Sequence, residues 1–82
     1  MKTAVIIKAV DWGIRASQTP ISEAKKLKEI PSWVSGFLVK EDDNSITIAH
    51  HWFEYPGEDD VRYITTIPKS CVLWRKDYSV EG

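Results

Sequence analysis

Two adjacent histidines and one cysteine are the side chains of this 82-residue chain that are best suited to bind a metal or attack a substrate. His50 and His51 fall within an expected strand, where neighbouring side chains point to opposite faces, so they cannot chelate one ion together. One imidazole could pair with Glu54 or Glu58, or join a site built across subunits. Cys71 begins an apolar segment without an orienting third residue, which is typical of a small buried side chain. We therefore expect no catalytic residue, no metal ligand and no cofactor.

Aromatic rings and cations offer a second kind of chemistry, in which bases stack on rings and phosphates bind positive charge. The chain has four Trp, three Tyr and two Phe, and each stacked base is worth roughly 1 to 3 kcal/mol. Trp12 and Trp52 are candidate stacking residues, because one lies in an expected loop and the other near a strand end. Arg62 is a candidate phosphate contact. Trp33 and Trp74 are expected in the core or in an interface, because a small domain needs large side chains there.

Length and composition limit the kind of protein that this can be. A chain of this length forms a single domain, here residues 1–82. The 11 Lys and Arg against 12 Asp and Glu give a net charge of −1, which excludes a globally basic nucleic-acid binder. A single cysteine excludes an intramolecular disulfide framework and a cysteine-rich zinc site. Because so small a domain buries little surface, we expect strand pairing with other copies to stabilise it.

Runs of β-branched and aromatic residues separated by polar tips indicate a mainly β protein. We expect five strands, at residues 3–10, 32–41, 45–55, 61–67 and 71–76, followed by a tail at about 77–82. The acidic tips at 41–44 and 56–60 hold residues that favour turns. Between the first two strands the apolar period becomes that of a helix. A short amphipathic helix is therefore expected at about residues 20–29, lying over an opening of the sheet.

Alternation within the second strand suggests how the sheet is built. Val34, Gly36 and Leu38 share one face, and Trp33, Phe37 and Val39 share the other, so both faces are apolar. A strand covered on two sides in so small a protein indicates a strong bend, with Gly36 where a missing Cβ allows close approach. We therefore expect a small five-stranded antiparallel barrel of the SH3-like or OB-like kind, with one short helix between its first and second strands.

Two segments resemble the motifs of the Sm-like family. Residues 34–51, VSGFLVKEDDNSITIAHH, are similar to the first motif, in which a strand glycine precedes an apolar residue, an acidic tip and an apolar triplet. Residues 61–74, VRYITTIPKSCVLW, resemble the second motif, in which a short turn joins the last two strands. The resemblance spans residues 5–74, extends to small bacteriophage proteins of this family, and implies an Sm-like barrel. The helix follows the first strand here, whereas it precedes that strand in the family.

The resemblance also implies a ligand site in two loops. Family members grip a base with the Asn of the triplet and with an Arg or Lys followed by Gly in the last turn. Thr47 stands at the Asn position, and Lys69 stands in the turn without the Gly. A hydroxyl cannot offer the paired donor and acceptor of an amide, so we expect contact with a phosphate or nucleotide in place of uridine-specific binding. The alternative is an ordinary strand residue and an ordinary turn lysine.

Family members assemble by pairing the fourth strand of one copy with the fifth strand of the next. The corresponding segments here, VRYITTI and CVLWRK, carry no interior Pro and no run of charges to block an edge. The resemblance therefore implies a homo-oligomeric ring of about five to seven copies. Its interface is expected at Val61, Tyr63, Thr65, Leu73 and Trp74. The alternative is a monomer whose edge is covered by residues 77–82.

These expectations combine into a non-enzymatic ring that binds RNA or a small nucleotide through Thr47, Lys69, Arg62, Trp12 and Trp52. For a phage protein, one form of this function is to sequester a host signalling nucleotide. A cytoplasmic location is expected, because no apolar run approaches the roughly 20 residues of a membrane span. The alternative is a structural or adaptor ring that binds another protein and no small ligand. An enzyme is not expected, because no acid–base pair, metal cluster or phosphate loop can be assembled.

Overall fold

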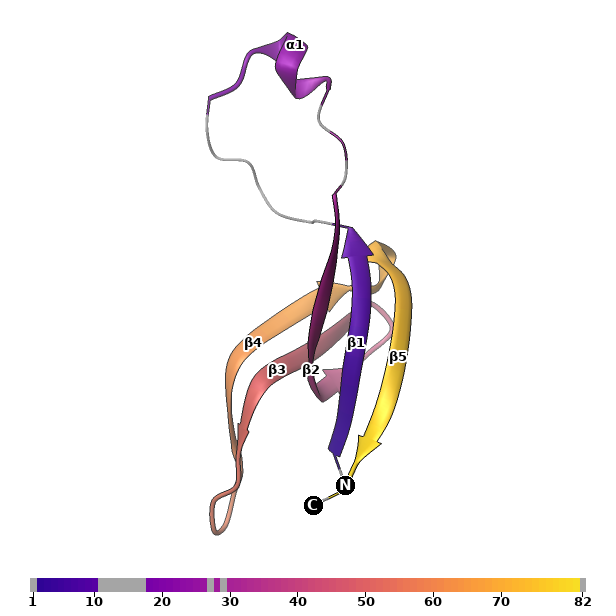
Figure 1. Cartoon of the computed structure of the whole chain (residues 1–82). Helices are drawn as coiled ribbons and strands as arrows, with labels where there is room; N and C mark the ends of the chain where they lie inside the picture. Colours follow the sequence, from indigo (N-terminus) through magenta and orange to yellow (C-terminus); the bar gives the residue numbers. More distant parts are fainter. Residues whose placement is uncertain (1, 11–17, 27, 29, 82) are drawn as a thin grey trace.

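The computed structural model describes residues 2–10, 18–26, 28 and 30–81. It confirms a mainly β protein built on one five-stranded antiparallel sheet (Figure 1). The elements in chain order are β1 (Lys2–Val10), α1 (Ile21–Ala24), β2 (Pro31–Glu41), β3 (Ser45–Phe53), β4 (Asp60–Pro68), a 3-10 turn (Lys69–Cys71) and β5 (Val72–Val80). The strand order is β4-β3-β2-β1-β5, so β1 lies between β2 and β5.

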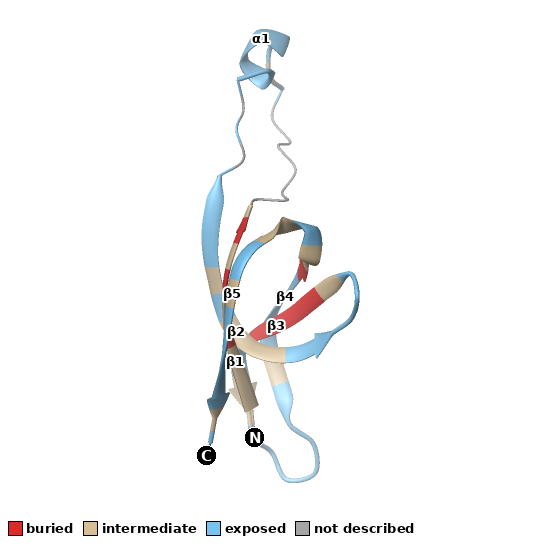
Figure 2. Ribbon diagram, turned by 90° about the vertical axis from the view of Figure 1, so that its right-hand side faces the viewer, coloured by how far each residue is buried: buried red, intermediate tan, exposed pale blue. Residues whose placement is uncertain are grey.

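The sheet is bent but not closed (Figure 2). β4 pairs with β3 and β5 pairs with β1, whereas β4 and β5 form the two outer edges. The closed barrel that the sequence predicts is therefore not observed. The 3-10 turn is the direct link between β4 and β5, and in the described part of the chain no strand covers the outer edge of either one.

The hydrophobic core is centred on β1, because the side chains of this strand alternate across the sheet. Val5, Ile7 and Ala9 are fully buried on one face. The buried residues that pack with them come from the other half of the bent sheet: Ile46, Ile48 and Ile67. A single bent sheet thus encloses its own core between its two halves.

Gly36 of β2 lies against the backbone of β3. A Cβ placed on Gly36 would come within 2.7 Å of the carbonyl oxygen of Ala49, which is closer than non-bonded atoms approach. The close approach predicted at this glycine is confirmed. The prediction that both faces of β2 are covered is wrong for the single chain. Val34 and Leu38 pack against the core, whereas Trp33 on the opposite face is 63% exposed.

The helix is shorter than predicted and does not cover the sheet. α1 spans four residues, all of them exposed, and it lies beyond the ends of β1 and β2 in Figure 1. Four residues are too few for an amphipathic stripe to gain stability from packing. None of the helical segments in the described ranges has the length and apolar character to cross a membrane.

The C-terminal segment also differs from the expectation. β5 continues to Val80, which pairs with Lys2. Residues 77–80, expected in a tail, therefore extend the strand instead of covering an edge. Cys71, expected to begin β5, lies in the 3-10 turn, where it is half-buried beside the core.

The turn between β2 and β3 forms in the way that its residue types predict. The Asp42 carboxylate accepts hydrogen bonds from the backbone N–H groups of Asn44, at 2.8 Å, and Ser45, at 2.9 Å. The hydrogen bond from Asn44 has the largest effect, followed by the one from Ser45, and both lower the pKa of Asp42. The turn is thus held by a side chain that mimics a backbone acceptor.

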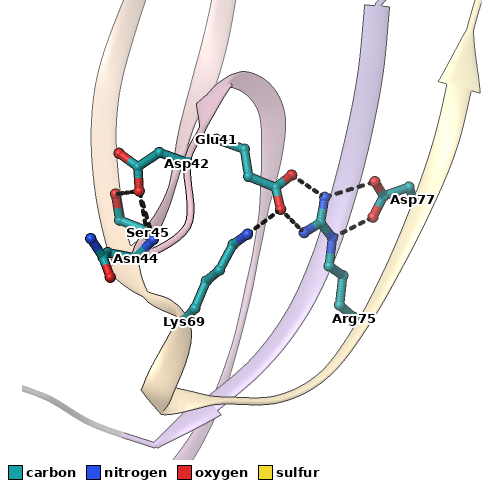
Figure 3. A network of polar contacts seen from close by, with 7 residues as sticks. All are labelled: Glu41, Asp42, Asn44, Ser45, Lys69, Arg75 and Asp77. Atoms are coloured by element: carbon teal, nitrogen blue, oxygen red, sulfur yellow. Dashed lines mark hydrogen bonds and ion pairs between the residues drawn. The ribbon is translucent and has the colours of Figure 1, made fainter.

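An ion network joins the end of β2 to β5 (Figure 3). The guanidinium of Arg75 donates two hydrogen bonds of 2.8 Å to the carboxylate of Glu41, and it also binds Asp77. The ammonium of Lys69 lies 2.8 Å from Glu41 Oε2. The hydrogen bonds from Arg75, which have the largest effect, and from Lys69 lower the pKa of Glu41 to about 2. The network therefore connects β2 with the 3-10 turn and with β5, although β2 and β5 are not neighbours in the sheet.

We expect Gly36→Ala to lower the free energy of unfolding by about 1 to 3 kcal/mol, because its Cβ would push β2 away from the carbonyl of Ala49. The measurement is urea denaturation followed by tryptophan fluorescence. The exposed Ser32→Ala on the same strand is the control, expected to change the free energy by less than about 0.5 kcal/mol. Equal stability of Gly36→Ala and the parent protein would contradict the close approach.

The lowered pKa of Glu41 makes its contribution to stability depend on pH. A carboxyl that titrates lower in the folded chain stabilises the fold above its ordinary pKa, and this stabilisation is lost as the pH falls toward about 2. Glu41→Gln should therefore be less stable than the parent at pH 7, and the gap should narrow between pH 4.5 and about 2. Urea denaturation across this pH range measures the gap.

Glu58→Gln is the matched control for this experiment, because Glu58 lies exposed in the tip between β3 and β4. It removes the same charge away from the network. A gap for Glu41→Gln that stays constant between pH 4.5 and 2 would show that the ion network does not set its titration.

Candidate functional site

Thr47 and Lys69, which the family resemblance implies for a ligand site, are both engaged within the chain. Thr47 is 7% exposed, and its hydroxyl shares a 3.0 Å hydrogen bond with the hydroxyl of Thr66. The Lys69 ammonium pairs with Glu41. Because a buried and paired hydroxyl does not reach solvent, the structure does not present Thr47 to a ligand.

Arg62 lies far from Thr47 on the hairpin of β3 and β4. The register pairs Thr47 with Thr66, and it pairs His51 with Arg62. Four residues along a strand correspond to about 13 Å. The two predicted contacts therefore belong to different parts of the hairpin.

Trp52 lies on another surface, apart from both Thr47 and Arg62. Its indole N–H donates a 2.8 Å hydrogen bond to Asp59, and its ring lies edge-on to Phe37 with 6.0 Å between centroids. Trp12 lies outside the described residues. The four predicted ligand residues that the structure describes do not form one site.

The predicted interface residues lie on the two outer edges of the sheet. Val61, Tyr63 and Thr65 are on β4, and Leu73 and Trp74 are on β5. Tyr63, Leu73 and Trp74 are largely exposed, whereas Val61 and Thr65 are half-buried. The exposed Ile64 of β4 was not predicted. Both edges thus carry exposed apolar side chains.

A third surface gathers aromatic rings and lysines in register. Residues paired directly across neighbouring strands share a face, and the pairings of β1 with β2 and with β5 align three rows of three residues. These rows are Trp33, Lys8 and Trp74; Ser35, Ile6 and Lys76; and Phe37, Ala4 and Tyr78. We call these nine residues the outer face, because they lie opposite the buried residues of β1.

Rings cover both ends of the outer face. Trp33 and Trp74 meet edge to face with 5.6 Å between centroids, and the Lys8 ammonium lies 5.5 Å from the Trp33 ring. At the other end, the Lys76 ammonium lies 5.3 Å from the ring of Tyr78. Cations beside ring faces are stabilised by the electron density of the ring. The face therefore presents flat apolar surfaces that are bordered by positive charge.

The outer face is locally basic although the chain is not. Lys8 and Lys76 are its charged members, and none of its nine residues is acidic. Lys2 follows on the same side of β1, 5.6 Å from the Trp52 ring and 2.6 Å from Glu54 Oε1. Acidic groups border the face on this side, because Glu54 pairs with Lys2 and Asp59 accepts a hydrogen bond from Trp52. The nine residues of the outer face thus carry two positive charges in a chain whose net charge is −1.

Two hollows have residues of the outer face among their lining residues, and they share Phe37. One, of about 350 Å³, is lined by Ala4, Val5, Ile6, Ser35, Gly36, Phe37, His50 and Tyr78. The other, of about 200 Å³, is lined by Lys2, Phe37, Trp52, Glu54, Val80 and Glu81. Rings stand among the lining residues of both hollows, so each can receive a small flat group.

The side chains of this surface are of kinds that can bind a ligand by contact alone. Stacking on exposed rings and contact between lysines and phosphates need no catalytic group. In the described ranges, no three His, Cys, Asp or Glu side chains gather closely enough to hold a metal ion. Of the four predicted ligand residues that the structure describes, only Trp52 borders this surface. The signal that sequence reasoning missed is the register, which alone brings Trp33, Lys8 and Trp74 into one row.

Comparison of the chain with protein-family models, with curated proteins and with solved structures finds no match.

Proposed function

We propose that the protein binds single-stranded RNA or a small nucleotide on its outer face and catalyses no reaction. The observation that carries this proposal is the alignment of rings and lysines in three adjacent rows of β2, β1 and β5. Every base has a flat π-face, so exposed rings bind unpaired bases with little regard to sequence. Lysines beside these rings would neutralise the phosphates that accompany the bases.

The shape of the outer face favours single strands over duplexes. Its rings belong to a sheet, and its hollows are shallow and open. In a duplex the base faces are already stacked within the helix, and only their edges are accessible in the grooves. Unpaired bases can turn their faces toward Trp33, Trp74, Phe37 and Tyr78. A single strand or a free nucleotide is therefore the ligand that this surface suits.

We also propose that the chain assembles as an Sm-like oligomer through β4 and β5. Two observations support this proposal. The outer edges of the sheet are those two strands, and both carry exposed apolar side chains, including Ile64 and Leu73. An open edge with such side chains is prone to pair with another strand. Pairing of β4 with β5 of the next copy would satisfy both edges at once.

A second candidate function is an adaptor that binds another protein. It is favoured by a strip of rings on the hairpin of β3 and β4, away from the outer face. His51 lies between Phe53 and Tyr63, with centroids at 6.1 and 5.1 Å, and Tyr55 stacks on Phe53. Arg62 lies 5.5 Å from the ring of Phe53. Aromatic residues and arginine are enriched in protein interfaces, so this strip suits a protein partner.

Binding to the outer face should depend on its lysines and rings in different ways. For a single-stranded RNA that makes three phosphate contacts, a plot of the logarithm of the association constant against the logarithm of the salt concentration has a slope of about −2. Lys8→Gln removes one contact and should reduce the magnitude of this slope by about 0.7. Trp33→Ala should weaken binding by roughly 1 to 3 kcal/mol with the slope unchanged. Fluorescence anisotropy with a labelled single-stranded oligonucleotide measures both effects.

Lys25→Gln is the matched control, because it removes the same charge from an exposed position at the end of α1 and should leave the slope unchanged. A labelled duplex of the same length should bind more weakly than the single strand. If neither single strands nor nucleotides bind, the proposal of a nucleotide ligand fails and the adaptor function takes its place.

Assembly should be visible as a particle whose mass is a multiple of the 9.4 kDa chain. Multi-angle light scattering at micromolar concentration measures that mass. Leu73→Lys places a charge on the edge of β5 and should shift the protein toward smaller species. Ser22→Lys adds the same charge to α1 and should leave the mass unchanged. A parent protein of 9.4 kDa under these conditions would refute the assembly.

A further inference from the structure

The last row of the outer face has a gap between two rings. Ala4 separates Phe37 from Tyr78 in this row, because it pairs with both of them. Strands are spaced so that the outer two of three lie about 9.6 Å apart. A base stacked between two rings needs them about 7 Å apart, which is twice the stacking distance of about 3.4 Å. The spacing of the strands exceeds that distance, and Phe37, Ala4 and Tyr78 together line the hollow of about 350 Å³.

The neighbouring rows leave no comparable space. Trp33 and Trp74 approach to 5.6 Å and meet edge to face, which closes the row over Lys8. In the middle row, Ile6 fills the position that Ala4 leaves open. The gap is therefore specific to the row that contains Ala4, because side chains fill the corresponding position in the other two rows.

Two polar residues line the same hollow as these rings. The 350 Å³ hollow that surrounds the gap is also lined by Ser35, Gly36 and His50. Within the described ranges, the side chains of Ser35 and His50 have no hydrogen-bond partner. A serine hydroxyl and a neutral imidazole each offer one donor and one acceptor. Both can therefore hydrogen-bond a base without breaking an existing interaction.

We propose that one base of the bound strand inserts between Phe37 and Tyr78 and is selected by hydrogen bonds to Ser35 and His50. This inference rests on the proposed binding of single strands to the outer face, and it adds preference for one base at one position. Lys76 lies beside Tyr78, where its ammonium meets the phosphate of the inserted nucleotide. Stacking on Trp33 and Trp74, four residues away along β2 and β5, holds other bases of the strand without selecting them.

The test compares the affinities for labelled eight-nucleotide homopolymers of A, U and C by fluorescence anisotropy. The parent protein should bind one of them at least about fivefold more tightly than the others, the effect of about one selective hydrogen bond. Ala4→Leu fills the gap without removing a contact group, so it should bring this ratio close to one. His50→Ala should lower the same ratio, which gives a second variant if Ala4→Leu folds poorly.

Two controls separate this inference from the proposed function. Trp33→Ala should weaken binding of all three homopolymers by a similar factor and keep the ratio between them. Lys25→Gln should change neither affinity nor ratio. Equal binding of A, U and C by the parent, or a ratio that survives both Ala4→Leu and His50→Ala, would overturn base selection while leaving strand binding intact. Binding of none of the homopolymers would instead refute the proposed function and the inference with it.

Discussion

The pairing of β1 with strands on both sides is the constraint on which the rest of the structure depends. Because β1 lies between β2 and β5, its alternation of side chains is imposed on three strands. Val5 and Ile7 turn inward and are fully buried, and Lys8 turns outward between two tryptophans. A shift of one residue in either pairing would exchange the two faces. The core and the outer face are therefore set by one register.

Local features of the fold could be predicted from the sequence because they depend on short-range chemistry. The five strands follow from runs of β-branched residues, and the turn at Asp42 follows from an acidic side chain that binds its own backbone. The close approach at Gly36 could be predicted because a glycine inside an apolar strand is typical of a bend or of tight backbone packing. The ends of the elements do not follow from local patterns: β5 runs to Val80 because Lys2 pairs with that residue, a contact between residues far apart in the sequence.

The candidate site could not be predicted in the same way, because it depends on register and burial. Alternation assigned Trp33 to one face of its strand but did not say whether another element covers that face. Thr47 was aligned with a ligand residue by its motif, yet it is buried and bound to Thr66 across the hairpin. The net charge of −1 argues against nucleic acid, because a sum over the chain cannot show that Lys8 and Lys76 share a face whose nine residues include no acid.

The two proposed properties, assembly and binding, meet at β5. This strand provides Trp74, Lys76 and Tyr78 to the outer face, and its free edge is one of the two edges of the sheet. In a single chain β5 has a neighbouring strand, β1, on one side and solvent on the other. The positions of these side chains therefore depend on one neighbouring strand alone. Pairing of β5 with β4 of another copy would place them inside a wider sheet and restrict their rotamers. Since fixed rings bind a base with a smaller loss of side-chain entropy than mobile rings, assembly would strengthen binding without adding any contact to the ligand.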